Sequence, residues 1–189
     1  MIRRLLFSFW LSLLLATVPL AAHASDEIEF VNASLESTEE GYRLSTAFSF
    51  DLTRPLEDAL MRGVPLYFTT QVQISRPRWY WLDDVAVNKT RTVRIAYNVL
   101  TSQYRASVDG SLHLNFTRLD EMLALLRRPG RWIVAEAGTL KDGQTYNVAV
   151  QMGLDVAQLP KPVQVSAISG ADWRISSGWR RFSFKADDK

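Results

Sequence analysis

Hydrophobic and polar residues alternate with a period of two along most of this chain, which is the pattern of half-buried β-strands. The alternation is strongest between Val64 and Asp109, where three such runs follow one another. The first run places one set of side chains on a single face: Leu66, Phe68, Thr70, Val72 and Ile74. We expect this central meander to organise the rest of the chain. Further strands are expected at residues 26–35 (with a bulge), 42–52, 111–116, 131–139, 144–154 and 163–168.

Two short stretches have helical spacing of their apolar residues instead. The first begins at Thr53, an N-cap residue type, and ends at Gly63, with Leu56 and Leu60 as its buried stripe. The second opens at Thr117 in the manner of a capping box and stops before residues 129–130, Pro-Gly. Its apolar stripe consists of Leu119, Met122, Leu123 and Leu126.

These elements indicate a mainly β protein. The chain shows no sustained alternation of strand and helix, and two short helices cannot cover both faces of a parallel sheet. We therefore expect an antiparallel β-sandwich, Ig-like in architecture, with two short crossover helices. The sequence has no internal repeat or low-complexity linker, so residues 25–189 are expected to form a single domain, with a corner at Pro160–Pro162.

The C-terminal segment is rich in aromatic residues. Trp173, Trp179, Phe182 and Phe184 fall within a short stretch, and exposing all four would create an apolar patch that monomeric proteins rarely carry. We expect this segment to pack against the central meander and to be required for folding, with 185–189 as a tail. The alternative is a segment that docks on a partner and is mobile when alone.

Residues 1–24 have the pattern of a secretory signal peptide. Arg3 and Arg4 precede an apolar run, and Ala22-His23-Ala24 is a small-residue cleavage site. The alternative is an uncleaved signal anchor, but the apolar run is shorter than the roughly 20 residues of a spanning helix. We expect a periplasmic protein that contacts the membrane only through this peptide, before cleavage after Ala24.

Composition narrows the chemistry. Of 22 basic residues two lie in the signal peptide, so the mature chain balances its 20 acidic ones and has no global charge that favours nucleic acid. Cysteine is absent, and His113 is the one histidine beyond residue 24. Thiol catalysis and thiolate or multi-histidine metal sites are therefore excluded. We expect no catalytic residue, metal or cofactor.

Two clusters of arginine and tryptophan are candidate binding residues. The first consists of Arg76, Arg78, Trp79 and Trp81, and the second of Trp173, Arg174 and Trp179. Aromatic faces beside guanidinium groups recognise sugars and peptides. The alternative is structural: Trp79 and Trp81 share one side of a strand and pack into the sandwich while the arginines extend to solvent. If the two clusters meet in space, a cation–π ladder results.

Carboxylates beside the first cluster offer a weaker enzymatic interpretation. Glycoside hydrolysis needs two carboxylates close together. Adjacent strand residues point to opposite faces, so Asp83 and Asp84 cannot readily form that pair with each other. A pair with a distant residue such as Glu136 is left open. His113 falls on a polar face and is expected to be exposed.

Several motifs taken together resemble the DUF4390 family of proteobacterial exported proteins. They span most of the mature chain and are Arg78-Trp-Tyr-Trp81, Val93-Arg-Ile-Ala-Tyr-Asn98, Gln103-Tyr-Arg105, Leu159-Pro-Lys-Pro162, Asp172-Trp-Arg174 and Ser177-Gly-Trp179. The resemblance implies a periplasmic protein of unassigned function, in gene neighbourhoods with a nitrogen-regulation-type sensor kinase. It carries no catalytic residue to this chain.

Two functional hypotheses follow. The first is a non-enzymatic domain that binds a periplasmic protein or an envelope component, with a possible sensor-kinase connection. The second is a glycan-binding or glycan-acting domain that uses the Trp79 and Trp81 cluster.

The signal-peptide assignment predicts the mass of the exported protein. Because the signal sequence ends in a small-residue cleavage site, protein purified from the cell envelope is expected to begin at Ser25. Intact-mass spectrometry measures this directly. A mass that retains residues 1–24 would establish the uncleaved anchor instead.

Overall fold

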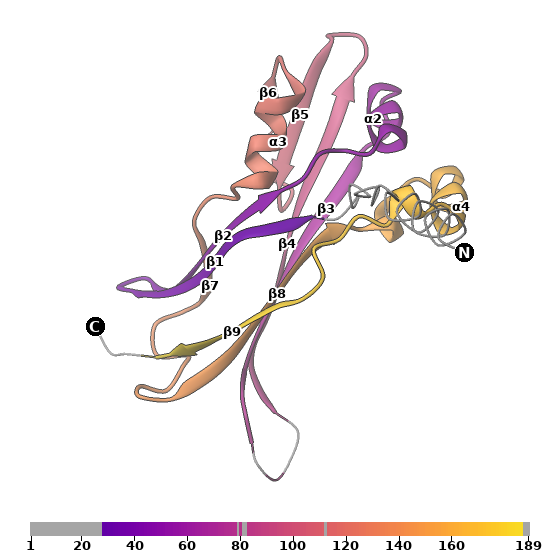
Figure 1. The fold of residues 1–189 in the computed structure, drawn as a ribbon. Coiled ribbons are helices and arrows are strands. Elements are labelled where there is room, and N and C mark those ends of the chain that lie inside the picture. Colours follow the sequence, from indigo (N-terminus) through magenta and orange to yellow (C-terminus); the bar gives the residue numbers. More distant parts are fainter. Residues whose placement is uncertain (1–27, 79, 81–82, 112, 187–189) are drawn as a thin grey trace, which may run out of the picture.

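The computed structural model describes residues 28–78, 80, 83–111 and 113–186, apart from the side chains of residues 168, 169 and 171. The predicted signal peptide, Trp79, Trp81 and Leu112 lie outside the described residues. Within this part of the chain nine strands form (Figure 1): β1 Glu29–Thr38, β2 Gly41–Ser49, β3 Leu66–Arg76, β4 Asp84–Asn98, β5 Gln103–Val108, β6 Leu114–Phe116, β7 Trp132–Ala135, β8 Thr145–Leu154 and β9 Arg180–Lys185.

The strands form two antiparallel sheets. The smaller has the order β1-β2-β7, and the larger has the order β6-β5-β4-β3-β8-β9. The mainly β class and the antiparallel pairing expected from the sequence are confirmed. The bulge predicted in the first strand is present between Phe30 and Asn32. β3 occupies the centre of the larger sheet, where it pairs with β4 on one side and β8 on the other.

One face of the larger sheet carries two neighbouring hydrophobic cores. Leu66 and Phe68 at the start of β3 belong to the first core, which also takes in the helices. Val72 and Ile74 further along the strand belong to the second core, which the small sheet covers with residues such as Leu44. All four β3 side chains are at most 1% exposed. The inward face predicted for this strand is therefore confirmed.

Both predicted helices are present. They are α2 (Arg54–Met61) and α3 (Leu119–Arg127). Leu56 and Leu60 are fully buried, and Gly63 follows α2 with a φ of 85°, which suits glycine after a helix. Three side chains of the α3 stripe are buried and the fourth is half-buried; the buried three are Met122, Leu123 and Leu126.

One of the two predicted caps has the predicted position. Thr53 is the N-cap residue of α2, but its hydroxyl does not bond the helix; it donates to the carbonyl of Asp172, at 2.9 Å, and so ties the helix to the C-terminal segment. The N-cap of α3 is Arg118, and Thr117 instead contacts the Glu121 carboxylate at 3.4 Å. The predicted capping box is therefore wrong, because α3 begins one residue later than an N-cap at Thr117 would place it.

The strand expected at residues 163–168 is a helix, α4 (Lys161–Ser169). Its β-branched residues favoured a strand, but Pro160 and Pro162 set the backbone for a first helical turn, where the missing N–H of proline costs nothing. Short 3₁₀ turns flank it, η1 (Val156–Gln158) and η2 (Ala171–Trp173). The expected count of two helices is therefore too low.

Two predicted strands are shorter than expected. The strand predicted at residues 131–139 is observed only as β7. It pairs with β2 in the small sheet, whereas β8 belongs to the large sheet. The turn between them thus crosses from sheet to sheet. Gly41 permits the β2–β7 contact, because a Cβ there would lie 2.2 Å from the Ala135 carbonyl oxygen. The second (111–116) reduces to β6, where Leu114 is 47% exposed.

Arg91 ties the two layers together. Its guanidinium lies 4.8 Å from the ring centroid of Trp132 on β7 and donates to the carbonyls of Gly130 and Arg131, both at 3.4 Å. Burial lowers the pKa of Arg91, while Asp109 opposes that shift. A stacked, hydrogen-bonded arginine therefore connects β4 to the segment that enters the small sheet.

The C-terminal segment packs on the large sheet. β9 pairs with β8 along its length, and Ile175 just before it is buried. Trp173 is half-buried against the first core, but Trp179 is 41% exposed, so the expected burial of all four aromatics is wrong for that residue. The expectation of a tail at residues 185–189 is wrong for its first two residues, because Lys185 belongs to β9 and Ala186 is buried, with backbone hydrogen bonds to residues 143 and 144. Residues 187–189 lie outside the described residues. No described helix has the length and apolar character of a membrane span.

Removal of the C-terminal segment is expected to destabilise the fold. A chain that ends at Ser169 loses β9, Ile175 and the acceptor of the Thr53 hydrogen bond. Loss of several buried side chains should lower the melting temperature by about 10 °C or more. Circular dichroism measures this, with a chain that ends at Ala186 as the control. A cooperative melt within a few degrees of the full-length protein would favour the docking-tail alternative.

Candidate functional site

The opposite face of the large sheet is the candidate site. We call the outward positions of β3, β4, β5, β8 and β9 the outer polar face. On β3 these positions are Tyr67, Thr69, Gln71, Gln73 and Ser75. In an antiparallel sheet, directly paired residues share a face. By this rule β8 contributes Asn147, Ala149, Gln151 and Gly153, and β9 contributes Arg181, Ser183 and Lys185.

Exposure shows that four strands of this face are open. Every outward position on β3, β4, β8 and β9 is half-buried or exposed, whereas the inward positions of β3 and β8 are buried almost without exception. On β5 the outward Ser107, which pairs with Arg94, is buried. The described helices lie with the inner core or beyond the end of the sheet (Figure 1), although η1 touches β3 at one end. A sheet with one packed and one solvated face is a normal antiparallel arrangement.

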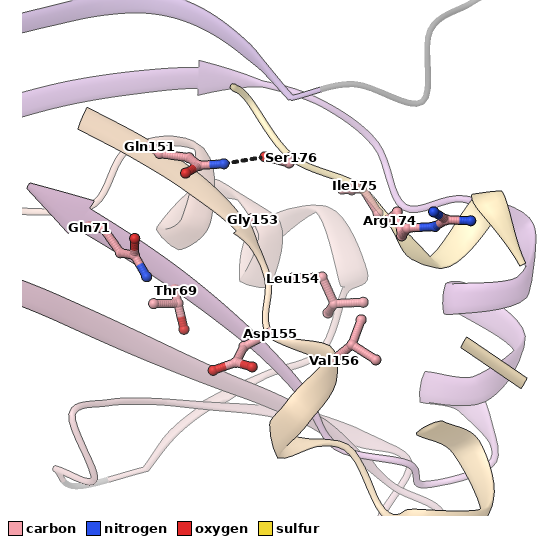
Figure 2. A pocket seen from close by; sticks show the side chains of 10 residues that line it. All are labelled: Thr69, Gln71, Gln151, Gly153, Leu154, Asp155, Val156, Arg174, Ile175 and Ser176. Carbon is pink, nitrogen blue, oxygen red and sulfur yellow. Dashed lines mark hydrogen bonds between the residues drawn. The ribbon is translucent and has the colours of Figure 1, made fainter. Parts of the chain in front are cut away.

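A hollow of about 390 Å³ lies at the η1 end of this face. Figure 2 shows Thr69 and Gln71 on one side and Gln151 with Ser176 on the other, joined by a 2.9 Å hydrogen bond from the Gln151 amide to the Ser176 hydroxyl. Gly153 lacks a side chain here because a Cβ would press on the backbone and side chain of residues 175 and 176 at 3.2–3.4 Å. The hollow is therefore lined on its strands by side chains that donate and accept hydrogen bonds, while Leu154, Val156 and Ile175 add apolar surface at its η1 end.

Two charged residues border this first hollow. Arg174 stands at its rim, with its guanidinium directed away from Gln151 (Figure 2). The Asp155 carboxylate accepts from the backbone N–H of Ala157 at 3.1 Å and from the Gln158 amide at 2.7 Å, so it caps η1. The carboxylate is thus engaged, whereas no ion pair involves Arg174 among the described residues.

A second hollow, of about 470 Å³, follows the first along the same strands. It is lined by Gln73 and Ser75 of β3, Asn147 of β8 and Arg181 of β9. Asp83 lies at its far end and accepts a 3.4 Å hydrogen bond from Ser75. From Thr69 to Ser75 the two hollows span roughly 20 Å, at the rise of an extended strand.

The predicted arginine–tryptophan clusters do not come together. Arg76 ends β3 and Arg78 lies in the turn that leads to β4, at the tip of a hairpin that projects from one end of the molecule, whereas Trp173 and Arg174 lie at η2 beside α4, away from that tip (Figure 1). Trp79 and Trp81 are outside the described residues. Trp179 immediately precedes β9. Among the described residues a cation–π contact joins Arg91 and Trp132, which belong to neither cluster. The ladder was expected only if the clusters met, and its Trp79 and Trp81 members stay untested.

The remaining candidates are exposed. Asp83, Glu136 and His113 each lie at the surface, as was expected for the histidine. The described residues contain no group of three or more side chains suited to hold a metal ion. What the sequence analysis missed is the row of amide and hydroxyl side chains between the apolar ones on β3 and β8. Their alternation was visible, but nothing in it indicated that the polar face would stay uncovered.

Asp84 links both predicted arginines beside the turn of the β3–β4 hairpin. Its carboxylate lies 2.6 Å from Arg78 and 2.9 Å from Arg76. The hydrogen bond from Arg78 lowers the pKa of Asp84, as does that from Arg76, although desolvation opposes them. Because the folded-state pKa is depressed, the ion pairs stabilise the turn end of the hairpin at neutral pH and are lost as the pH falls through that lowered value.

Replacement of Arg78 should therefore raise the pKa of Asp84. In Arg78→Gln the largest contribution to the shift is gone, so the carboxyl is expected to titrate closer to an ordinary aspartate. An NMR pH titration of the side-chain carboxyl carbon measures it, with Arg62→Gln as a distant control. If Asp84 titrates identically in both variants, Arg78 does not set its pKa.

Comparison with known proteins identifies a family for this chain but no individual relative. No curated protein and no solved structure matches the chain. The family model described as "Domain of unknown function (DUF4390)" matches residues 25–183, which include every described strand and helix except the last two residues of β9. The chain therefore belongs to the DUF4390 family, as the motifs around its central meander and C-terminal segment predicted.

Proposed function

We propose that this protein is a non-enzymatic, exported domain of the bacterial periplasm that binds an envelope component across its outer polar face. The observation that carries the proposal is the openness of that face. Four adjacent strands present side chains that are half-buried or exposed, and two hollows follow one another along them. Clefts with convergent polar groups are the usual places where ligands bind.

The character of the lining supports binding rather than bond cleavage. Gln71, Gln73, Asn147 and Gln151 are amides, which recognise ligands through hydrogen bonds and have no acid–base role near neutral pH. The Asp155 carboxylate caps η1. The expected link to a sensor-kinase system is part of the same proposal: a bound envelope component would be the signal. The Ig-like classification of the sandwich also remains a proposal.

Glycan recognition by Trp79 and Trp81 remains the alternative from the sequence. Tyr80 between them is 65% exposed, which favours an accessible hairpin tip. The flanking arginines have another role, since Arg76 and Arg78 both pair with Asp84. We therefore place the principal surface on the strands and not at the tip.

The proposal predicts where an envelope ligand perturbs the protein. The full chain, expressed with its own N-terminal segment and labelled with ¹⁵N, is titrated with soluble envelope fractions: a peptidoglycan digest, lipid-free polysaccharide and periplasmic extract. Amide shifts are expected to change at residues 69–75 and 147–153, because those strands border both hollows.

A matched pair of variants sharpens this test. Gln71→Trp places a bulky ring on the outer polar face and should abolish the shifts, whereas Glu40→Trp, in the exposed turn between β1 and β2, should not. Shift changes confined to the Tyr80 region would favour the hairpin-tip alternative. Perturbation that survives Gln71→Trp would contradict the proposal.

A further inference from the structure

The outer polar face has a charge pattern that the net charge of the whole chain does not reveal. Its strand positions carry four basic residues and, among the described residues, no aspartate or glutamate. The basic residues are Arg94, Arg105, Arg181 and Lys185. None of them forms an ion pair with a described residue. The outward strand positions of this face are therefore basic, and basic side chains attract anions. Two carboxylates border the hollows: Asp155 caps η1 at the first, and Asp83 accepts a hydrogen bond from Ser75 at the far end of the second.

Two of these arginines are close neighbours. Arg94 of β4 pairs with Ser107 of β5, so Arg105 is its diagonal neighbour on the same face, with roughly 7–8 Å between backbone positions. The Nε of Arg105 is screened from solvent and has no hydrogen-bond partner within the described residues. Two like charges without a counter-charge repel each other, and a bound anionic group would relieve that repulsion.

The neutral part of the face indicates what carries the anion. Between the basic residues lie amides and hydroxyls on three adjacent strands, among them Thr69, Gln71 and Gln73 on β3 and Asn88 and Thr90 on β4. Protein–protein interfaces have aromatic and aliphatic centres and are depleted in serine. Large apolar side chains are scarce at the described outward positions, so a surface of this kind suits a ligand rich in hydroxyl groups better than a folded protein.

We propose that the outer polar face binds an extended glycan chain that bears carboxylate or phosphate groups. This inference rests on the proposed function and names its ligand class. The chain lies along the two consecutive hollows, where amides hydrogen-bond its hydroxyls. Arg174 at the rim of the first hollow and Arg181 in the second pair with its anionic groups, since guanidinium matches carboxylate and phosphate in two-point geometry.

The experiment compares matched ligands. Isothermal calorimetry with the full chain uses oligogalacturonate for carboxylates, phosphorylated mannan oligosaccharide for phosphates, the methyl ester of the first as a neutral match, and oligoglutamate as an acidic peptide. At least one anionic oligosaccharide is expected to bind, with affinity that falls as salt rises. The methyl ester and oligoglutamate should bind at least about tenfold more weakly.

Two double variants with equal charge change locate the site. The R174Q/R181Q variant should bind the anionic oligosaccharide at least about tenfold more weakly than the unaltered chain does. The R54Q/R128Q variant changes two exposed arginines on the helix side of the molecule. Its affinity for the anionic oligosaccharide should stay within about twofold of that of the unaltered chain. Both pairs of arginines are exposed, so the melting temperatures should match that of the unaltered chain.

The remaining results of these binding experiments would each contradict a specific part of the inference. Equal binding of the methyl ester removes the anionic requirement, and preference for oligoglutamate assigns the face to an acidic protein segment. If no anionic oligosaccharide binds while envelope fractions still shift residues 69–75 and 147–153, the ligand class is wrong and the proposed function survives. If neither binds there, both are wrong.

Discussion

The one-sided burial of β3 is the constraint on which the rest of the structure depends. Its inward side chains supply both hydrophobic cores, Leu66 and Phe68 to one and Val72 and Ile74 to the other, and its backbone pairs with strands on both sides. Because side chains alternate across a strand, a shift of one residue in register would move that whole set into solvent. The pairing of β4 and β8 with β3 is thus fixed by the same residues that form the cores.

The two cores need two different covers. The small sheet covers the half that includes Val72 and Ile74, whereas α2, α3 and the C-terminal turns cover the half that includes Leu66. Specific contacts hold these covers in place: Arg91 stacks on Trp132 of the small sheet, and Arg127 of α3 donates to the Phe50 carbonyl and pairs with Asp51. Among the described residues the covering sheet and helices lie on the inner face, and η1 alone touches β3 at one end of the outer face, so most of the outer face is solvated.

The distribution of charge follows from this one-sidedness. Acidic residues engage arginines at the periphery, as Asp84 does beside the turn of the β3–β4 hairpin and Glu36 does with Arg43 on the small sheet. The outward positions of the large sheet retain basic side chains without such partners. Net charge averages over these regions, so a neutral total is compatible with a strongly polarised surface. For this chain the local field is the informative quantity for recognition.

The sequence by itself determined the local elements. Period-two alternation located the strands of the central meander, helical spacing located α2 and α3, and Gly63 marked the end of a helix, because these signals act between near neighbours. It failed where local signals compete: the β-branched residues after Pro160 favoured a strand, but the prolines permitted α4.

Only the tertiary structure decided that β7 and β8 belong to different sheets, that Arg76 and Arg78 lie apart from Trp173 and Arg174, and that the described elements leave the polar side of β3 uncovered. Each of these depends on contacts between residues distant along the chain, and alternation records only that a strand has two faces. Which face is buried follows from its apolar residues, but whether another layer covers the polar one depends on the packing of the whole fold.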